Sequence, residues 1–268
     1  MNYDRYTKDP KNSALFNGNM TSMGGNGAPD PKYTGFRSNN GLIKSGGGGG
    51  CVTDGPFKEF VSSDSLEDFQ VTNTITSYQA NLGPGAPMMD NVPRNPATNW
   101  GAYNPRCMRR DVNVNIALGA TAEKAYNLIT KSKDINTFYN TLLTPPPNSS
   151  DPYNWGIHTS GHYISGGDPV CFPISLKLSW SNYLQGGDPM CSPGDPIFYF
   201  HHAMLDRLWW IWQMQDPDNR INAQVSLGGS GATNRKIDLK WLAADVIPVL
   251  EAHDSLGGQK GAFCHVYV

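Results

Sequence analysis

The stretch that decides the fold reads DPIFYFHHAMLDRLWWIWQM and runs from Asp195 to Met214. Apolar side chains recur in it at steps of three and four residues, which is the spacing of one helix face. They also cover most of the circumference, so we predict a buried helix from about Ile197 to Met214. Pro196 suits the first position of that helix, and Asp195 can cap its N-terminus.

A second helical region lies upstream of this stretch, from about Ala120 to Leu143. Its apolar residues recur near helical spacing and the pattern breaks around Ser132, which predicts one or two helices. The run Pro145-Pro146-Pro147 ends the region, because proline cannot continue the hydrogen bonding of a helix. Residues 1–60, in contrast, are polar and glycine-rich and show no helical period.

These patterns predict a mainly α protein that forms a single domain, residues 1–268. The chain contains 29 glycines and 20 prolines, and only 16% of its residues are charged, so long irregular loops must wrap a modest set of helices. We divide the domain into a loop-rich part, residues 1–119, and a helical part, residues 120–268.

Composition and charge exclude several classes of protein. The formal net charge of -2 leaves no basic surface for nucleic acid, and no apolar run reaches the roughly 18 residues of a membrane span. The five cysteines lack C-x-x-C spacing, which argues against a zinc ribbon or a thioredoxin-type redox site. The amino terminus has no apolar signal region, so the compartment is unknown and secretion requires a true amino terminus further upstream.

The histidines carry the clearest chemical signal. His158 and His162 are four residues apart, which on a helix places both imidazoles on one face about 6 Å apart. His202 lies on the predicted buried helix, where an unpaired polar ring is costly unless it finds a partner. Three imidazoles without a thiolate or carboxylate suit copper or zinc equally. Thr159 stands where the H-E-x-x-H motif of zinc peptidases requires glutamate, so that motif is not matched.

The block from Asp195 to Trp212 resembles the second-copper signature of the tyrosinase family of type 3 copper proteins, D-P-x-F-x-x-H-H-x-x-x-D-R-x-W. An H-x-x-x-H pair lies on the correct side of it. The resemblance implies that His158, His162 and His202 hold copper, one ion in this chain and two in a complete family member. It also implies a helical-bundle copper site wrapped in long loops, without the first-copper helices.

Other positions carry over from the same resemblance. Phe198 corresponds to an aromatic residue that packs over the copper ligands near the substrate entrance, and His201 to a residue that packs behind them. Asp206 resembles the carboxylate that orients the ligands and a nearby arginine. The segment 264–267 resembles the family's Tyr-x-Tyr element with His265 in place of the first tyrosine, so we interpret His265 as structural and His253 as a solvated loop residue.

The resemblance extends to the loop-rich part, where three blocks are similar to fungal, especially ascomycete, members, and it implies a disulfide between Cys51 and Cys107. Two stretches interrupt the pattern, residues 61–79 and 170–185. We hypothesise that both are retained introns, which sequencing of the transcript tests; the alternative is a pair of ordinary surface loops, which a chain tolerates at small entropic cost. No histidine precedes His158, so we expect the chain to begin just after the first-copper half.

The resemblance implies copper-dependent oxidation of phenolic or o-diphenolic substrates to quinones with dioxygen. Family members that hydroxylate monophenols carry asparagine after the first of these histidines. Thr159 stands there in this chain, which favours diphenols or aminophenols. Two alternatives remain: an inactive fragment or non-catalytic copper- or oxygen-binding relative, and a single-metal zinc hydrolase, for which we find no general-base carboxylate near the ligands.

Overall fold

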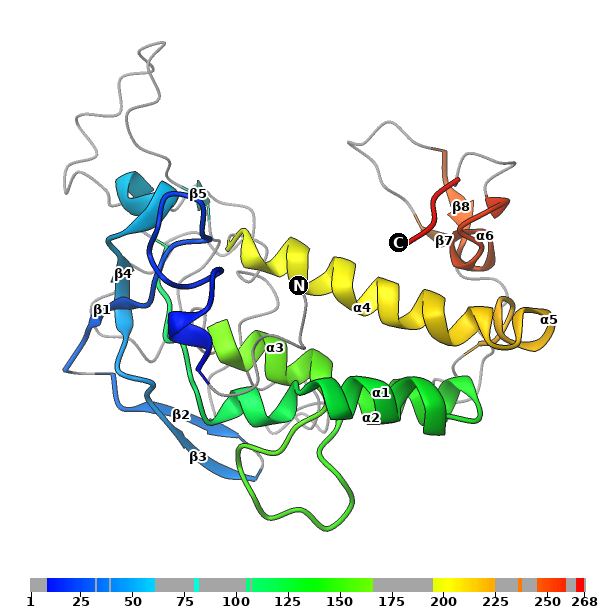
Figure 1. Cartoon of the computed structure of the whole chain (residues 1–268), viewed down its shortest axis with the longest axis horizontal. Helices are drawn as coiled ribbons and strands as arrows, with labels where there is room; N and C mark the ends of the chain where they lie inside the picture. The colour runs from blue at the N-terminus through cyan, green and yellow to red at the C-terminus, as the bar shows by residue number, and fades with distance from the viewer. Residues whose placement is uncertain are drawn as a thin grey trace.

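The computed structural model (Figure 1) describes ten ranges of the chain. They are residues 9–31, 33–38, 40–60, 80–81, 105–106, 108–165, 195–224, 236–237, 245–258 and 264–267. The two stretches interpreted as introns, 61–79 and 170–185, lie outside the described residues, and so does Cys107. Cys51 is disulfide-bonded, but its pairing with Cys107 stays a prediction for that reason.

Four helices form the helical part of the fold, and they pack as a small bundle (Figure 1). They are α1 (Ala122–Lys131), α2 (Ile135–Leu143), α3 (Ile157–Ser165) and α4 (Ile197–Met214). Two shorter helices follow, α5 (Pro217–Arg220) and α6 (Val249–His253). The predicted helix from Ile197 to Met214 is confirmed at its bounds, and the predicted region before the prolines is two helices.

Local capping explains why the region before the prolines divides into two helices. The Thr121 hydroxyl accepts a hydrogen bond from the Lys124 backbone at 3.3 Å and begins α1. The Asp134 carboxylate accepts one from the Thr137 backbone at 2.8 Å and begins α2. Each cap satisfies a backbone N–H that the first turn of a helix leaves without a partner. Ser132 lies between them in extended conformation, as the sequence pattern indicated.

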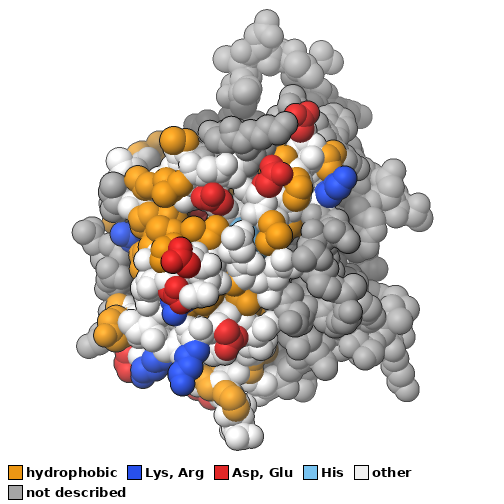
Figure 2. All heavy atoms as spheres, turned by 90° about the vertical axis from the view of Figure 1, so that its right-hand side faces the viewer, with side chains coloured by type: hydrophobic (Ala, Val, Ile, Leu, Met, Phe, Trp, Pro, Cys, Tyr) orange, Lys and Arg blue, Asp and Glu red, His pale blue; other side chains and the backbone are white. Residues whose placement is uncertain are grey.

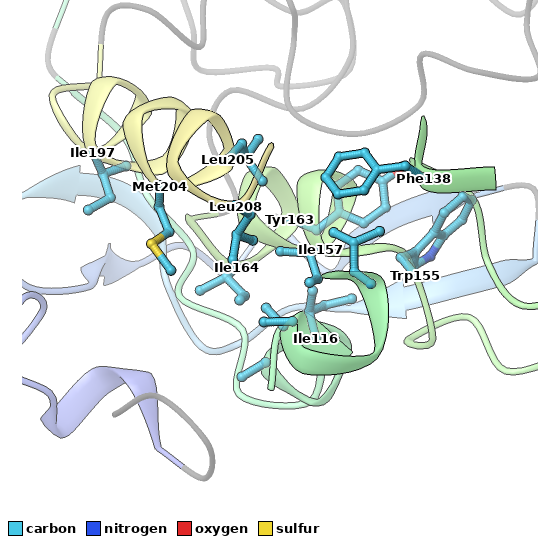
Figure 3. Close-up of a cluster of buried hydrophobic side chains, with 14 of the residues drawn as sticks. Ile116, Phe138, Trp155, Ile157, Tyr163, Ile164, Ile197, Met204, Leu205 and Leu208 are labelled. Carbon is cyan, nitrogen blue, oxygen red and sulfur yellow. The ribbon is translucent and has the colours of Figure 1, made fainter. Parts of the chain in front are cut away.

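The core lies where α4 crosses the other three helices (Figure 3). Trp212 is fully buried, its ring lies 5.1 Å from that of Phe138, and its indole N–H donates to the Ser132 carbonyl at 2.8 Å. Burial of a large apolar side chain stabilises a fold by about 1.5–3 kcal/mol. The same cluster contains Ile157 and Ile164 of α3 and other apolar side chains of α1, α2 and α4. It also takes in residues of the loop-rich part such as Phe16 and Ile43, so α3 and α4 are fixed against both parts of the chain.

The loop-rich part contains only two-stranded sheets among the residues that the structure describes. Its antiparallel pairs are β1 (Gly27–Pro29) with β4 (Gly49–Val52), β2 (Gly35–Ser38) with β3 (Gly41–Lys44), and β5 (Ala80–Asn81) with β6 (Pro105–Arg106); a fourth pair, β7 (Lys236–Ile237) with β8 (Ile247–Pro248), lies in the helical part. Three short 3-10 helices complete the loop-rich part: η2 (Pro10–Asn12), η3 (Gly55–Phe60) and η5 (Ile116–Gly119). The fold is therefore mainly α with long loops, as predicted.

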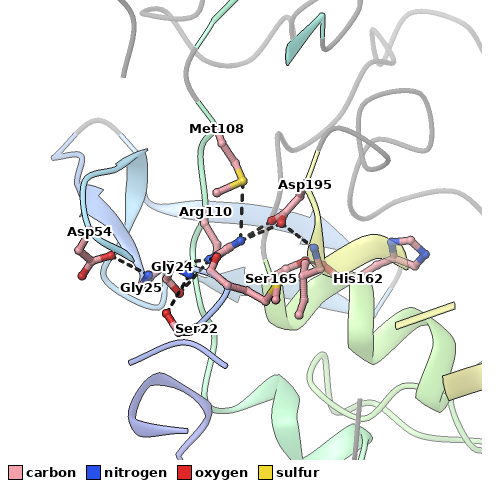
Figure 4. A network of polar contacts seen from close by, with 11 residues as sticks. Ser22, Gly24, Gly25, Asp54, Met108, Arg110, His162, Ser165 and Asp195 are labelled. Carbon is pink, nitrogen blue, oxygen red and sulfur yellow. Dashed lines mark hydrogen bonds and ion pairs between the residues drawn. The ribbon is translucent and has the colours of Figure 1, made fainter. Parts of the chain in front are cut away.

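A buried ion pair joins the loop-rich part to the start of α4 (Figure 4). Arg110, whose side chain is fully buried, donates to both carboxylate oxygens of Asp195 at 2.7 and 3.1 Å. It also donates to the carbonyls of Met23, Gly24 and Gly25. Asp195 in turn accepts the backbone N–H of Ile197 at 3.0 Å, so the predicted cap is present. The arginine thus fixes the residue that caps α4.

The start of α4 differs slightly from the prediction. Pro196 is not the first residue of the helix but the one before it, although its backbone is already helical, with φ -54° and ψ -26°. Its fixed φ suits either position, because the ring sets the angle near the helical value.

The face on the right-hand side of Figure 1 carries acidic, basic and hydrophobic side chains in mixture (Figure 2). Its described lysines and arginines do not form a continuous patch. Within the described ranges, no helix is both long enough and apolar enough to cross a membrane.

Candidate metal centre

Helix α3 positions the first two predicted ligands. His158 and His162 lie on successive turns, their Nε2 atoms are 3.1 Å apart, and their ring centroids are 4.7 Å apart. The spacing of four residues places both rings on the same face of the helix, as the sequence predicted.

Helix α4 brings the third predicted ligand to the same point. The Nε2 atom of His202 lies 3.2 Å from that of His162, and its ring centroid lies 5.3 Å from His158 and 5.2 Å from His162. Nitrogen atoms bound at 2.0–2.1 Å to one tetrahedral metal ion lie about 3.3 Å apart. The separations of the His162 nitrogen from those of His158 and His202 thus match the spacing of one coordination sphere.

His201 competes with His202 for the third position on distance alone. Ligand nitrogens of His158, His162 and His201 all lie within 4.8 Å of one another. However, the Nε2 atom of His201 lies 2.9 Å from the backbone carbonyl of His158, so it must carry a proton and donate it there. That nitrogen therefore cannot bind a metal, but Nδ1 of the same ring keeps its lone pair, so His202 as the third ligand stays a prediction. His201 packs behind the ligands and ties α4 to α3.

A glycine makes room for this arrangement. Gly161 lies between the two histidines of α3, and a Cβ atom there would lie 2.0 Å from Cε1 of His201 and 2.4 Å from both ring nitrogens. The imidazole of His201 therefore occupies the space that any other residue would fill. Gly161 was not among the residues predicted from the sequence, although a glycine inside a helical pattern often marks such close packing.

The electrostatics of the site favour neutral imidazoles. Burial, with smaller contributions from the neighbouring histidines, lowers the pKa of His158 to about 4 and the pKa of His162 to about 3. Burial also lowers the pKa of His202. Neutral rings offer the lone pairs that a metal requires.

The hydrogen-bonding inventory also fits a metal ion. Nε2 of His162 lies within hydrogen-bonding distance of Nε2 of His158 and of Nε2 of His202. In a neutral ring this atom carries either one proton or one lone pair, so it cannot pair with both neighbours in the same role, as donor or as acceptor. A shared cation would satisfy all three rings. The all-imidazole donor set suits copper or zinc, and the residues therefore fit the group that the sequence suggested.

Acidification is expected to destabilise the metal-free protein. His158 and His162 have pKa values below the ordinary 6.5 in the folded state, so the unfolded state binds more protons as the pH falls. Their stabilising contribution is present above about pH 6.5 and is lost towards pH 3 to 4. We expect a loss of about 2 kcal/mol between about pH 7.5 and about pH 5.5, measured by urea unfolding. His162→Gln should show roughly half of that loss, and an unchanged loss would contradict the assignment.

Two other residues predicted from the sequence, Phe198 and Asp206, differ in what they contact. Phe198 covers His202, with ring centroids 4.2 Å apart, and lies 5.9 Å from His162. Asp206 accepts a hydrogen bond from the hydroxyl of Tyr267 and lies 3.9 Å from Nε2 of His265. Asp206 thus contacts Tyr267 and His265 of the segment 264–267, and its expected role in orienting the ligands stays a prediction.

A cavity of about 500 Å³ opens beside the two ligands His158 and His202. Most of its wall is apolar and comes from α2, α4 and α6. The apolar wall residues are Ile135, Phe138, Leu142, Leu143, Leu205, Trp209, Ala223 and Val249. An apolar cavity with a few polar groups is the usual form of a small-molecule site.

His253 is the residue that the sequence placed wrongly. We expected a solvated loop residue, but it ends α6, is half-buried, and lines this cavity with its ring 4.8 Å from that of Trp209. The pairing of β8 with β7, and the packing of α6 against α4, bring it there. Such contacts join segments about forty residues apart and leave no local pattern in the sequence.

Comparisons with known proteins agree on one family. The family model described as "Common central domain of tyrosinase" matches residues 2–215. Tyrosinase P of Aspergillus terreus is 32% identical over 231 residues, covering 84% of this chain and 53% of that protein. The tyrosinase-like protein orsC of Emericella nidulans is 29% identical, covering 77% and 47%. This chain thus spans about half the length of the curated relatives it matches.

A solved structure agrees as well. A mutant polyphenol oxidase from Thermothelomyces thermophila superimposes with a TM-score of 0.66 at 26% identity, covering 98% of this chain and 64% of that one. Nearly the whole chain therefore has a counterpart in that fold.

Proposed function

Because the chain belongs to the tyrosinase family of type 3 copper oxidases, we propose that it binds copper and oxidises phenolic or o-diphenolic substrates to quinones with dioxygen. The observation that carries the proposal is the convergence of three Nε2 atoms, at 3.1 and 3.2 Å, beside an apolar cavity of about 500 Å³. His158, His162 and His202 would hold the ion, and copper would supply the redox chemistry that imidazoles lack.

The cavity walls support an aromatic substrate. Phe138, Leu205 and Trp209 offer flat and branched apolar surfaces that can hold a phenol ring out of water. His158 and His202 are among the polar residues that line the same space, so a ring seated beside them would direct its hydroxyl groups towards the proposed metal ligands. Phe198 covers His202 and limits its exposure to water.

Diphenols or aminophenols are the preferred substrates in this proposal. Thr159 follows His158, and its hydroxyl donates to the carbonyl of Leu143 at 2.7 Å. That hydrogen bond fastens α3 to the end of α2, so the hydroxyl proton is not free to position a water molecule beside the ligands. Family members that hydroxylate monophenols use such a water as the base, so the engaged Thr159 favours diphenols or aminophenols.

One specific observation favours a second candidate, a non-catalytic copper-binding or oxygen-binding relative. The chain has six histidines and none precedes His158, so it supplies one three-histidine set. A complete member of the family uses two coppers, each held by three histidines. Copper binding without oxidation of catechols would support this candidate.

Copper loading tests the proposal directly. We expect one copper ion per chain, measured by mass spectrometry of the metal content, and quinone formation from 4-methylcatechol well above that from 4-methylphenol. His162→Gln should reduce copper affinity at least about 10-fold, because a ligand is lost. His265→Gln, an exposed histidine outside the cavity, is the matched control and should bind as the parent does. Equal binding by both variants, or a preference for zinc, would refute the copper site.

A further inference from the structure

One carboxylate lies on the wall of the cavity beside the candidate ligands. Among the described residues that line this cavity, Asp206 is the only one with an acidic or strongly basic side chain. The three histidines of the same wall, His158, His202 and His253, offer no compensating charge at neutral pH, because burial lowers the pKa of each of them. The described wall thus combines apolar surface with a single carboxylate.

The described residues hold the Asp206 carboxylate through one of its two oxygens. Oδ2 accepts a hydrogen bond from the hydroxyl of Tyr267. Burial, followed by that hydrogen bond and the charge of Asp206, raises the pKa of the Tyr267 hydroxyl, so it remains a donor. Nε2 of His265 lies 3.9 Å from the same Oδ2, which is beyond hydrogen-bonding distance. Within the described part of the chain, Oδ1 makes neither a hydrogen bond nor an ion pair, so it is left for a ligand.

The position of Asp206 relative to the candidate ligands defines what such a ligand can be. Asp206 follows His202 by four residues on α4, so the two side chains lie on one face of the helix, about 6 Å apart along its axis. Leu205 and Trp209 of the same helix add apolar wall beside them. A phenol ring that directs its hydroxyl group towards His202 therefore has a carboxylate within reach of a short substituent.

We infer that Asp206 sets the charge preference of the cavity: it binds the protonated amine of a phenol or o-diphenol with a short aminoalkyl side chain, and it repels phenols that carry a carboxylate. The inference rests on the proposed function and names its substrate class. A hydrogen bond between an ammonium group and a carboxylate is stronger than one between neutral groups. The Asp206 side chain is 52% exposed, so water screens part of the attraction and the preference is modest.

Three phenols of similar length that differ in charge test the inference. Tyramine carries an ammonium group at the end of its side chain, 4-propylphenol a methyl group, and 3-(4-hydroxyphenyl)propanoate a carboxylate. Binding is measured by isothermal titration calorimetry on the full chain without copper, so that no turnover interferes. The parent should bind tyramine about 10-fold more tightly than the propanoate, since Asp206 attracts the first and repels the second.

Two variants and the salt concentration show whether this preference comes from Asp206. Asp206→Asn removes the charge and keeps an oxygen for Tyr267, so the preference should fall to about 2-fold or less while the affinity for 4-propylphenol stays within about 2-fold of the parent's. Asp218→Asn is the matched control, because Asp218 of α5 is exposed and lies outside the described wall, and it should keep the preference. Salt at about 0.5 M should reduce the parent's preference by about 2-fold or more, because ions screen the charges.

The outcomes separate the inference from the proposed function. Equal affinity of the parent for tyramine and the propanoate, or a preference that Asp206→Asn retains, would overturn the inference. Equal losses for all three probes in Asp206→Asn would overturn it too, because the carboxylate would then only hold Tyr267 in place. If that variant does not fold, the parent decides, since a preference that salt leaves unchanged is not electrostatic and contradicts the role of Asp206.

Failure of all three probes to bind would also overturn the inference. Oxidation of 4-methylcatechol by the copper-loaded chain would then show that the proposed reaction stands without it. A charge preference that depends on Asp206, in a chain that does not oxidise catechols after copper loading, would support the inference and refute only the proposed reaction.

Discussion

Arg110→Met is expected to destabilise the protein by about 3–5 kcal/mol, because breaking a buried ion pair leaves the other charge without its partner. The Arg110 side chain is fully buried and that of Asp195 is 10% exposed, so water cannot replace the lost contacts. The three carbonyls that Arg110 bonds would lose their donor as well. Since Asp195 caps α4, the helix that carries His202 should lose order at its start.

Urea unfolding followed by tryptophan fluorescence measures this effect. Arg220→Met is the matched control, because that guanidinium lies over the Trp212 ring at 4.6 Å but is only partly buried, and it should cost about 0.5–1 kcal/mol. If Arg110→Met does not fold, Asp195→Asn, which keeps the capping oxygen, can be measured in its place. A cost for Arg110→Met no larger than that of the control would show that the ion pair does not hold the two parts together.

Gly161→Ala is expected to cost about 1–3 kcal/mol and to weaken copper binding by about 10- to 100-fold. At an exposed helical position the same change would stabilise by about 0.5–1 kcal/mol. Here the new Cβ would overlap the ring of His201, which is 2% exposed and held by the carbonyl of His158. Either the ring or α3 must move, and α3 carries two of the three proposed ligands.

A double-mutant cycle isolates the steric cause. His201→Ala removes the ring and opens the space, so adding Gly161→Ala to that variant should be neutral or slightly stabilising. Stability is read from urea unfolding, and copper affinity from titration against a competing chelator. If Gly161→Ala costs the same in both backgrounds, the overlap with His201 is not what makes glycine necessary.

Sequence patterns were sufficient to predict the features that depend only on residues close together in the chain. The period of the stretch from Asp195 to Met214 predicted α4 at its bounds, and the four-residue spacing of His158 and His162 predicted that their rings would share a face. Apolar periodicity and ligand spacing are properties of single helices, so they can be read without knowledge of the fold.

Contacts between distant segments were not predictable in the same way. The pairing of Arg110 with Asp195 spans 85 positions, and nothing near either residue indicates the other. The location of His253 depends on how α6 packs against α4, and the clearance at Gly161 depends on a ring from another helix. The candidate ligands were therefore predictable from the sequence, but the residues that hold them in place and the position of His253 at the cavity were not.

The separation of the ligands along the chain has a consequence for how the protein acquires its metal in the cell. His162 and His202 are 40 positions apart, and a ribosome adds about 5–20 residues per second. A nascent chain therefore displays a two-imidazole half-site for about 2–8 seconds before the third ligand is synthesised. Until then only two of the three predicted ligands exist, so the complete three-imidazole site can form only after His202 has been synthesised.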